Sequence, residues 1–135
     1  MHNTSTDPTI GDSMFVRILI AASVVVSAVV HYKLWDDGYK DIDVVGPLFL
    51  VNAVGGLVVS LAVLVWRHWL PLLAAVGFGA STLIAFALST TPGGFMDVHE
   101  TWSGAFQIVG AVSEGLAVLL GGFAILRERR PERST

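Results

Sequence analysis

One carboxylic acid lies in the middle of the last long hydrophobic stretch of the chain, and it is the residue most suggestive of chemistry. Glu114 lies about twelve residues after Trp102, or about 18 Å along a helix that rises about 1.5 Å per residue. A carboxyl at that depth in a membrane costs at least about 2.5–3.5 kcal/mol, even on insertion scales. We therefore expect Glu114 to face the protein interior as a hydrogen-bonded neutral acid, unless a cation or water reaches it.

Polar residues continue from Glu114 along the same face. Glu100, Gln107 and Glu114 are seven residues apart, which is about two helical turns. The other hydrophobic stretches carry small or polar residues at helical spacing, namely Ser23, Ser27 and His31, then Asn52, Gly56 and Ser60, then Thr82, Ala85 and Ser89. The pattern predicts a ligand or ion pathway that opens outward, lined by Glu114, Gln107, Asn52, His31 and Glu100.

A structural interpretation accounts for much of this pattern. Small polar side chains in membrane helices commonly hydrogen-bond a neighbouring helix, at about 0.6 kcal/mol each. A protonated Glu114 could likewise be tied to Asn52. A neutral glutamine would join helices at lower cost, so the functional interpretation of Glu114 stays open beside the structural one.

Divalent metal binding is a further alternative. His31, His99 and Glu100 all fall near the outer face, and imidazole and carboxylate are ligands that such ions accept. The spacing matches no preassembled motif such as HxxxH, and we predict no cofactor. The chain also lacks a nucleophile–base pair, a phosphate-binding glycine loop and a dinucleotide fingerprint, so nothing positive supports enzyme activity.

The elements that must position these residues are membrane helices. Hydrophobic residues make up 53% of the 135 and charged residues only 14%, against roughly 45–50% and about 25% in soluble domains. Four long apolar runs, 14–35, 44–66, 69–88 and 102–126, each suit a bilayer crossing and lack the alternation of barrel strands. We expect an all-α membrane protein with four transmembrane helices in an antiparallel bundle, a flexible cytoplasmic tail (1–13) and a basic cytoplasmic tail (127–135). Cleavage after Val26-Ser27-Ala28, as in a signal peptide, fits less well because the apolar run continues.

The distribution of charge predicts the orientation. One side holds Arg17, Arg67, Arg127, Arg129, Arg130 and Arg133, whereas the other holds Lys33, Lys40 and a group of acidic residues. Arginine-rich ends face the cytoplasm, so both termini should lie there. Arg17, inside the first span, is expected to extend its side chain to the headgroups.

Small residues and short connections predict the packing. Residues spaced by four should allow close helix approach, namely Gly56 and Ser60, then Ala75 and Gly79, then Ser113, Ala117 and Gly121. Only Arg67 and His68 separate the second and third spans, so these should form a tight helical hairpin. The long outer loop before Trp102 could fold back over the mouth of the bundle.

Composition also excludes several classes of function. Cysteine is absent, which excludes disulfides, thiolate metal sites, iron–sulfur clusters and a cysteine nucleophile. The net charge is −3, and the basic residues lie at membrane edges instead of along a groove. Nucleic acid is therefore not an expected partner.

The segment His31-Tyr32-Lys33-Leu34-Trp35, followed by Tyr39, Ile42 and Gly46-Pro47-Leu48-Phe49-Leu50-Val51-Asn52, carries a resemblance. It resembles uncharacterised small four-span integral membrane proteins of high-GC Gram-positive bacteria, mainly over residues 31–52. The resemblance implies a multi-pass protein of the cell membrane and an approximate fold, and it transfers no catalytic residue.

Three possible functions follow from these observations. The first is a small non-enzymatic membrane protein that acts by helix association in the lipid bilayer, as an accessory subunit of a membrane-protein complex or as a homo-oligomer. The alternative is a carrier or sensor for a proton, cation or small amphiphile, with a polar interior centred on Glu114. A metal-dependent enzyme or redox partner using His31, His99 and Glu100 is the third.

Overall fold

The computed structural model describes residues 8–130 and is built from four long helices. They are α1 (Pro8–Asp36), α2 (Val45–Val65), α3 (Trp69–Ser89) and α4 (Ala105–Glu128), with a short 3-10 helix, η1 (Tyr39–Asp41), between α1 and α2. Each of the four contains a segment long and apolar enough to cross a membrane: Ser13–Asp36, Val45–Val65, Trp69–Ser89 and Ala105–Glu128. The prediction of four helices long and apolar enough to cross a membrane is confirmed, and the ends of these helices differ from the predicted span ends by only a few residues.

The first helix is longer than the hydrophobic run predicts. It begins at Pro8, within the segment 1–13 that the sequence predicts as a tail. Proline suits the first helical turn, where its missing N–H would have no helical partner. The rest of the predicted tail, and residues 131–135 of the basic one, lie outside the described residues.

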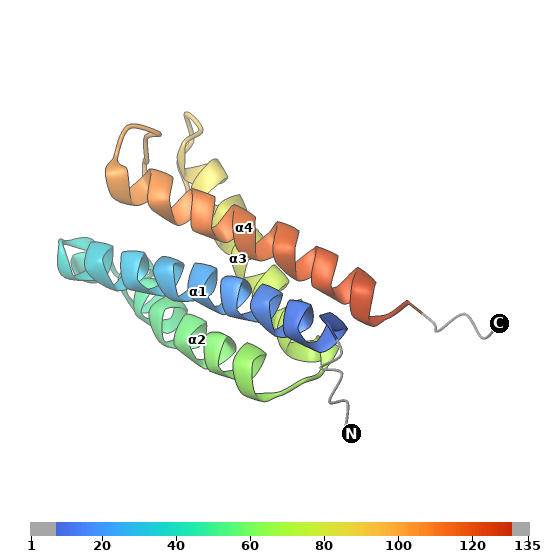
Figure 1. The fold of residues 1–135 in the computed structure, drawn as a ribbon. Helices are drawn as coiled ribbons and strands as arrows, with labels where there is room; N and C mark the ends of the chain where they lie inside the picture. Colours follow the sequence, from blue (N-terminus) through green and yellow to red (C-terminus); the bar gives the residue numbers. More distant parts are fainter. Residues whose placement is uncertain (1–7, 131–135) are drawn as a thin grey trace, which may run out of the picture.

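Successive helices run in opposite directions, and both ends of the described chain lie at the same end of the molecule (Figure 1). Helix α1 packs against α2 and α4, and α3 packs against α4, whereas α2 and α3 touch only sparsely. The largest fully buried core side chains come from α1, α2 and α3, namely Ile20, Val24, Val63 and Leu72.

The expected tight hairpin of the second and third spans is therefore wrong. A Cβ atom at Gly56 of α2 would lie 3.0 Å from Cζ of Phe78, so the aromatic ring of α3 already fills the space beside the glycine. A ring of this size between two helices prevents the close approach that small residues on both sides would allow.

The small residues predicted to support close packing are all buried, and this prediction is confirmed. Gly56 and Ser60 pack on α1, where a Cβ at Gly56 would lie 2.9 Å from the Cβ of Ala28. Ala75 and Gly79 of α3 and the three small residues of α4 are likewise buried. These residues join helices of the same chain.

The loop between α3 and α4 folds back over the outer end of the bundle, as predicted. Phe95 and Val98 exchange backbone hydrogen bonds of 2.9 Å, and the Glu100 N–H donates to the Ser89 carbonyl at 3.0 Å. Met96 and Asp97 adopt φ values of 49° and 63°, which non-glycine residues rarely adopt. The fold-back brings Glu100 beside the helix ends.

Candidate functional site

The sparse contact between α2 and α3 leaves a cavity of about 470 Å³ in the half of the bundle away from the termini. Helices α1 and α4 and the α3–α4 loop complete its walls. The residues that line it include Val30, His31, Leu34, Leu48, Phe49, Val51, Asn52, Phe78, Thr82, Ala85, Phe86, Glu100, Gln107 and Glu114. Its volume lies within the range of about 300–1,000 Å³ that small-molecule sites occupy.

All five residues of the predicted pathway line this one cavity, although they come from four different segments. His31 lies on α1, Asn52 on α2, Glu100 in the outer loop, and Gln107 and Glu114 on α4. Gln107 and Glu114 project from the same face of α4 because they are two helical turns apart. The structure thus brings the five predicted residues together around one cavity.

Glu114 lies deepest among the polar residues and is 3% exposed. The Ser27 hydroxyl donates a 2.8 Å hydrogen bond to Glu114 Oε1, and Nδ1 of His31 lies 3.9 Å from the same oxygen. Nδ1 also lies 2.8 Å from the Ser27 carbonyl oxygen and donates to it in the tautomer that carries a proton there. The partner of Glu114 is therefore Ser27 of α1, and the alternative in which Asn52 binds it is wrong.

Two polar groups in the cavity have capacity left for a further partner. Ser27 donates to Oε1 of Glu114, and the Thr82 hydroxyl also lies close to this carboxyl, although its hydrogen bonds of 2.9 and 3.0 Å go to the Phe78 and Gly79 carbonyls. Asn52 makes no side-chain hydrogen bond to any residue between 8 and 130, although it lines the same cavity. The site therefore holds an acceptor and an amide that a bound molecule could engage.

A second carboxyl stands at the outer end of the cavity. The Gln107 Nε2 group donates to Glu100 Oε2 at 3.0 Å, which joins the loop to the first turn of α4. Gln107 lies across Gly104, and a Cβ atom at position 104 would collide with its amide. The absence of a side chain at Gly104 thus lets Gln107 hold Glu100 over the cavity.

The remaining wall is apolar and partly reaches the surface that faces the membrane. Rings of Phe49, Phe78 and Phe86 line the cavity, and the His31 ring packs on Phe49 with centroids 5.1 Å apart. At the rim, Val51 is 67% exposed. Exposed positions on an apolar helix border acyl chains when the helix crosses a bilayer, so this rim lies on the surface that lipid would cover.

The three residues considered for a metal are not brought together as one ligand set. His31 lies in the cavity wall, whereas His99 is exposed on the loop, where it packs against Gly94. Within residues 8–130, no group of three His, Asp or Glu side chains is placed to hold a metal ion. The geometry therefore gives this alternative no support.

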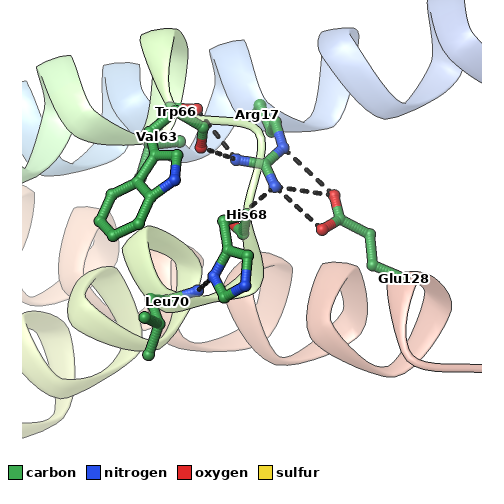
Figure 2. Close-up of polar contacts among 6 residues, drawn as sticks. All are labelled: Arg17, Val63, Trp66, His68, Leu70 and Glu128. Atoms are coloured by element: carbon green, nitrogen blue, oxygen red, sulfur yellow. Dashed lines mark hydrogen bonds and ion pairs between the residues drawn. The ribbon is translucent and has the colours of Figure 1, made fainter.

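A second polar cluster lies near the end of the bundle that holds the chain termini, and Figure 2 shows its contacts. Arg17 is 2% exposed, and its guanidinium forms three hydrogen bonds with the Glu128 carboxylate, at 2.9–3.1 Å. It also donates to the backbone carbonyls of Val63, Trp66 and His68, at 3.0, 3.3 and 2.9 Å. The expectation that Arg17 reaches the headgroups is wrong, because its partners satisfy it inside the protein. The sequence analysis missed Glu128, whose only signal is an acidic residue at the inner end of the last span.

Comparison of the chain with protein-family models, with curated proteins and with solved structures gave no match. The functional interpretation consequently rests on the geometry of the cavity.

Proposed function

We propose that the protein binds a small amphiphilic molecule in the cavity between α2 and α3, as a sensor or carrier in the cell membrane. The observation that carries this proposal is the cavity itself, which unites all five predicted residues in a space of ligand size. It has polar groups at its floor and outer end and an apolar wall between them. A molecule with one polar end and an apolar body complements that distribution.

The rim favours entry from the membrane. Leu48 and Val51 of α2 line the cavity and are also exposed, so an apolar chain could pass between α2 and α3 without crossing water. The polar head would then reach Glu114, Asn52 and Gln107. Amphiphiles partition into the bilayer, which raises their concentration beside the rim of the cavity.

The inner cluster favours a sensor over a carrier that alternates its access. Arg17 ties α1 to the end of α4 and to the connection between α2 and α3. Opening that end would separate a buried cation from its carboxylate, at a cost of several kcal/mol. The cavity therefore stays accessible from one side.

Helix association is less well supported than ligand binding. The small residues that would have formed the contact surface, such as Gly56, Gly79 and Gly121, are already buried between helices of this chain. An accessory subunit or a homo-oligomer would have to use the large apolar side chains on the outside instead. Those side chains are what lipid contact alone requires.

Photolabelling tests the binding proposal. The protein in phosphatidylcholine vesicles is irradiated with a decyl alcohol that carries a diazirine, and the labelled peptides are identified by mass spectrometry. We expect label on the cavity walls around Phe49 and Phe86, above that on the outer surface. Ala85→Trp places an indole in the cavity and should reduce this labelling about tenfold, the factor that about 1.4 kcal/mol of binding energy gives.

A matched control lies two residues away. Ala87 is on the same helix but is exposed and does not line the cavity, so Ala87→Trp should leave the labelling unchanged. Equal labelling of all membrane-facing surfaces, or an unchanged pattern in Ala85→Trp, would contradict ligand binding in the cavity.

The antiparallel bundle with both termini in the cytoplasm is also part of the proposal, supported by the arginine distribution and by the resemblance of residues 31–52. Because the chain has no cysteine, single introduced cysteines report topology without background. We expect a membrane-impermeant maleimide to label Asp43→Cys in intact cells, and Arg130→Cys only after the membrane is opened. The reverse result would invert the orientation.

A further inference from the structure

Building on the proposed function, we propose that the ligand of this cavity is an amphiphilic cation, such as an alkyl amine or a quaternary ammonium compound. Its charged head would lie between Glu114 and Glu100, and its apolar chain would lie against the phenylalanine rings between α2 and α3. The proposal rests on the charge, the hydrogen-bonding capacity and the shape of the cavity.

The ionisable residues that line the cavity favour a positive ligand. They are Glu100, Glu114 and His31, and no lysine or arginine is among the described lining residues. The outer lysines are engaged elsewhere, since Lys33 lies 2.8 Å from Asp37 and Lys40 lies 3.5 Å from Asp36. A cationic head would therefore meet two carboxyls without competition from a basic side chain of the site.

Glu114 has a particular need of a positive partner. Its Oε1 accepts from Ser27, the nearby Thr82 hydroxyl donates to backbone carbonyls at 2.9 and 3.0 Å, and the side chain is almost fully buried. An ionised carboxylate there would be poorly solvated, because one or two hydroxyl groups do not replace its hydration. A cation in the cavity would supply the opposite charge that this carboxylate lacks.

The aromatic wall suits the rest of such a molecule. Phe49, Phe78 and Phe86 line the cavity near these carboxyls, and aromatic rings attract cations through their electron-rich faces. Val30, Leu34 and Leu48 provide the surface for an alkyl chain. An anionic head would meet only repulsion from Glu100 and Glu114.

Competition against the photoreactive decyl alcohol tests the charge preference. Decyltrimethylammonium, decanol and decyl sulfate share the same chain, and each is compared at equal mole fraction in phosphatidylcholine vesicles. We expect the cation to halve cavity labelling at about a tenfold lower mole fraction than decanol, because its charge is attracted to the carboxyls and the aromatic rings of a water-poor site. Decyl sulfate should compete least.

Two variants test whether the cation preference comes from Glu114. Glu114→Gln keeps an acceptor for Ser27 and removes the charge, so decyltrimethylammonium should lose its advantage over decanol. Asp97→Asn removes a carboxylate from the outer loop, away from the cavity lining, and asparagine tolerates the positive φ there. That control should keep the full cation preference.

The outcomes separate the two proposals. Cavity labelling that decanol and decyltrimethylammonium displace equally well in the unaltered protein would overturn the cation inference and leave amphiphile binding intact. Absence of cavity labelling would overturn amphiphile binding itself. The order in which the three decyl compounds compete in the unaltered protein tests the cation inference even if Glu114→Gln does not fold. Loss of the cation preference in Asp97→Asn would assign that preference to the general surface charge.

Discussion

Glu128→Ala is expected to lower the free energy of unfolding by about 3 kcal/mol, one of the two largest effects predicted for a single substitution in this chain. Arg17 is buried and receives its counter-charge from Glu128. Removing one partner of a buried pair leaves the other as an uncompensated charge, which costs roughly 3–5 kcal/mol. We expect a loss at the lower end of this range, because Glu128 is 28% exposed and water can reach the carboxylate. Unfolding in mixed micelles with increasing denaturing detergent measures the change.

An exposed ion pair at the end of α1 provides the control. Lys33 and Asp37 lie 2.8 Å apart, with side chains 48% and 46% exposed. Exposed pairs contribute about 0–1 kcal/mol, so Asp37→Ala should change the stability little. If both alanine variants lost the same stability, the Arg17 cluster would have no special role in closing the inner end of the bundle.

Gly79→Ala is expected to destabilise the protein by about 1–3 kcal/mol, the usual range for overpacking. A Cβ atom at Gly79 would lie 2.7 Å from the Glu114 carbonyl oxygen and 3.0 Å from a methyl group of Val118. A backbone oxygen cannot rotate away, so α3 and α4 would have to separate at the level of Glu114. The same variant should therefore also weaken photolabelling of the cavity.

Gly77 lies two residues earlier on the same helix and has nothing within 4 Å of an added Cβ. Gly77→Ala should leave stability unchanged or raise it slightly, because alanine is the better helix former. The thermal midpoints of the two variants in one detergent make the comparison. Equal midpoints would mean that the close approach of α3 to α4 at Gly79 contributes nothing.

The Arg17 cluster and the ring of Phe78 both affect the spacing of α2 and α3, and therefore the cavity between these helices. The Arg17 cluster holds the inner end of the α2–α3 connection, and the ring of Phe78 keeps the two helices apart. Between these two points α2 and α3 cannot close on each other, which leaves the space that Glu114 faces. Substitutions far from Glu114 should therefore change ligand binding through the spacing of α2 and α3.

Several features of the site were predictable from local pattern. Gln107 and Glu114 were expected on one face because seven residues make two helical turns, and both line the cavity. Glu100 was expected on the same helical face and also lines the cavity, but from the loop, because α4 begins only at Ala105. The fold-back of the outer loop was also expected, as was the burial of the small residues. Each of these depends on spacing within one segment or on composition.

Other features depended on pairs far apart in the sequence. Arg17 and Glu128 are 111 positions apart, and nothing local distinguishes this pair from an arginine that reaches the headgroups. Likewise, Asn52 was the partner considered for Glu114, and the structure has Ser27 in its place. The choice between them depends on the rotation of each helix about its axis, and one residue of error turns a side chain by about 100°.

The sequence by itself determined the number of long apolar helices, their approximate ends and the position of Glu114 along the last of them. Hydrophobicity must persist over the full thickness of a bilayer, so it is visible in any single segment. Only the tertiary structure decided that α2 and α3 stand apart, that Ser27 binds Glu114 and that Arg17 binds Glu128. Those outcomes depend on how the side chains of four helices fill space together, and a bulky residue such as Phe78 on one helix changes what the others can contact.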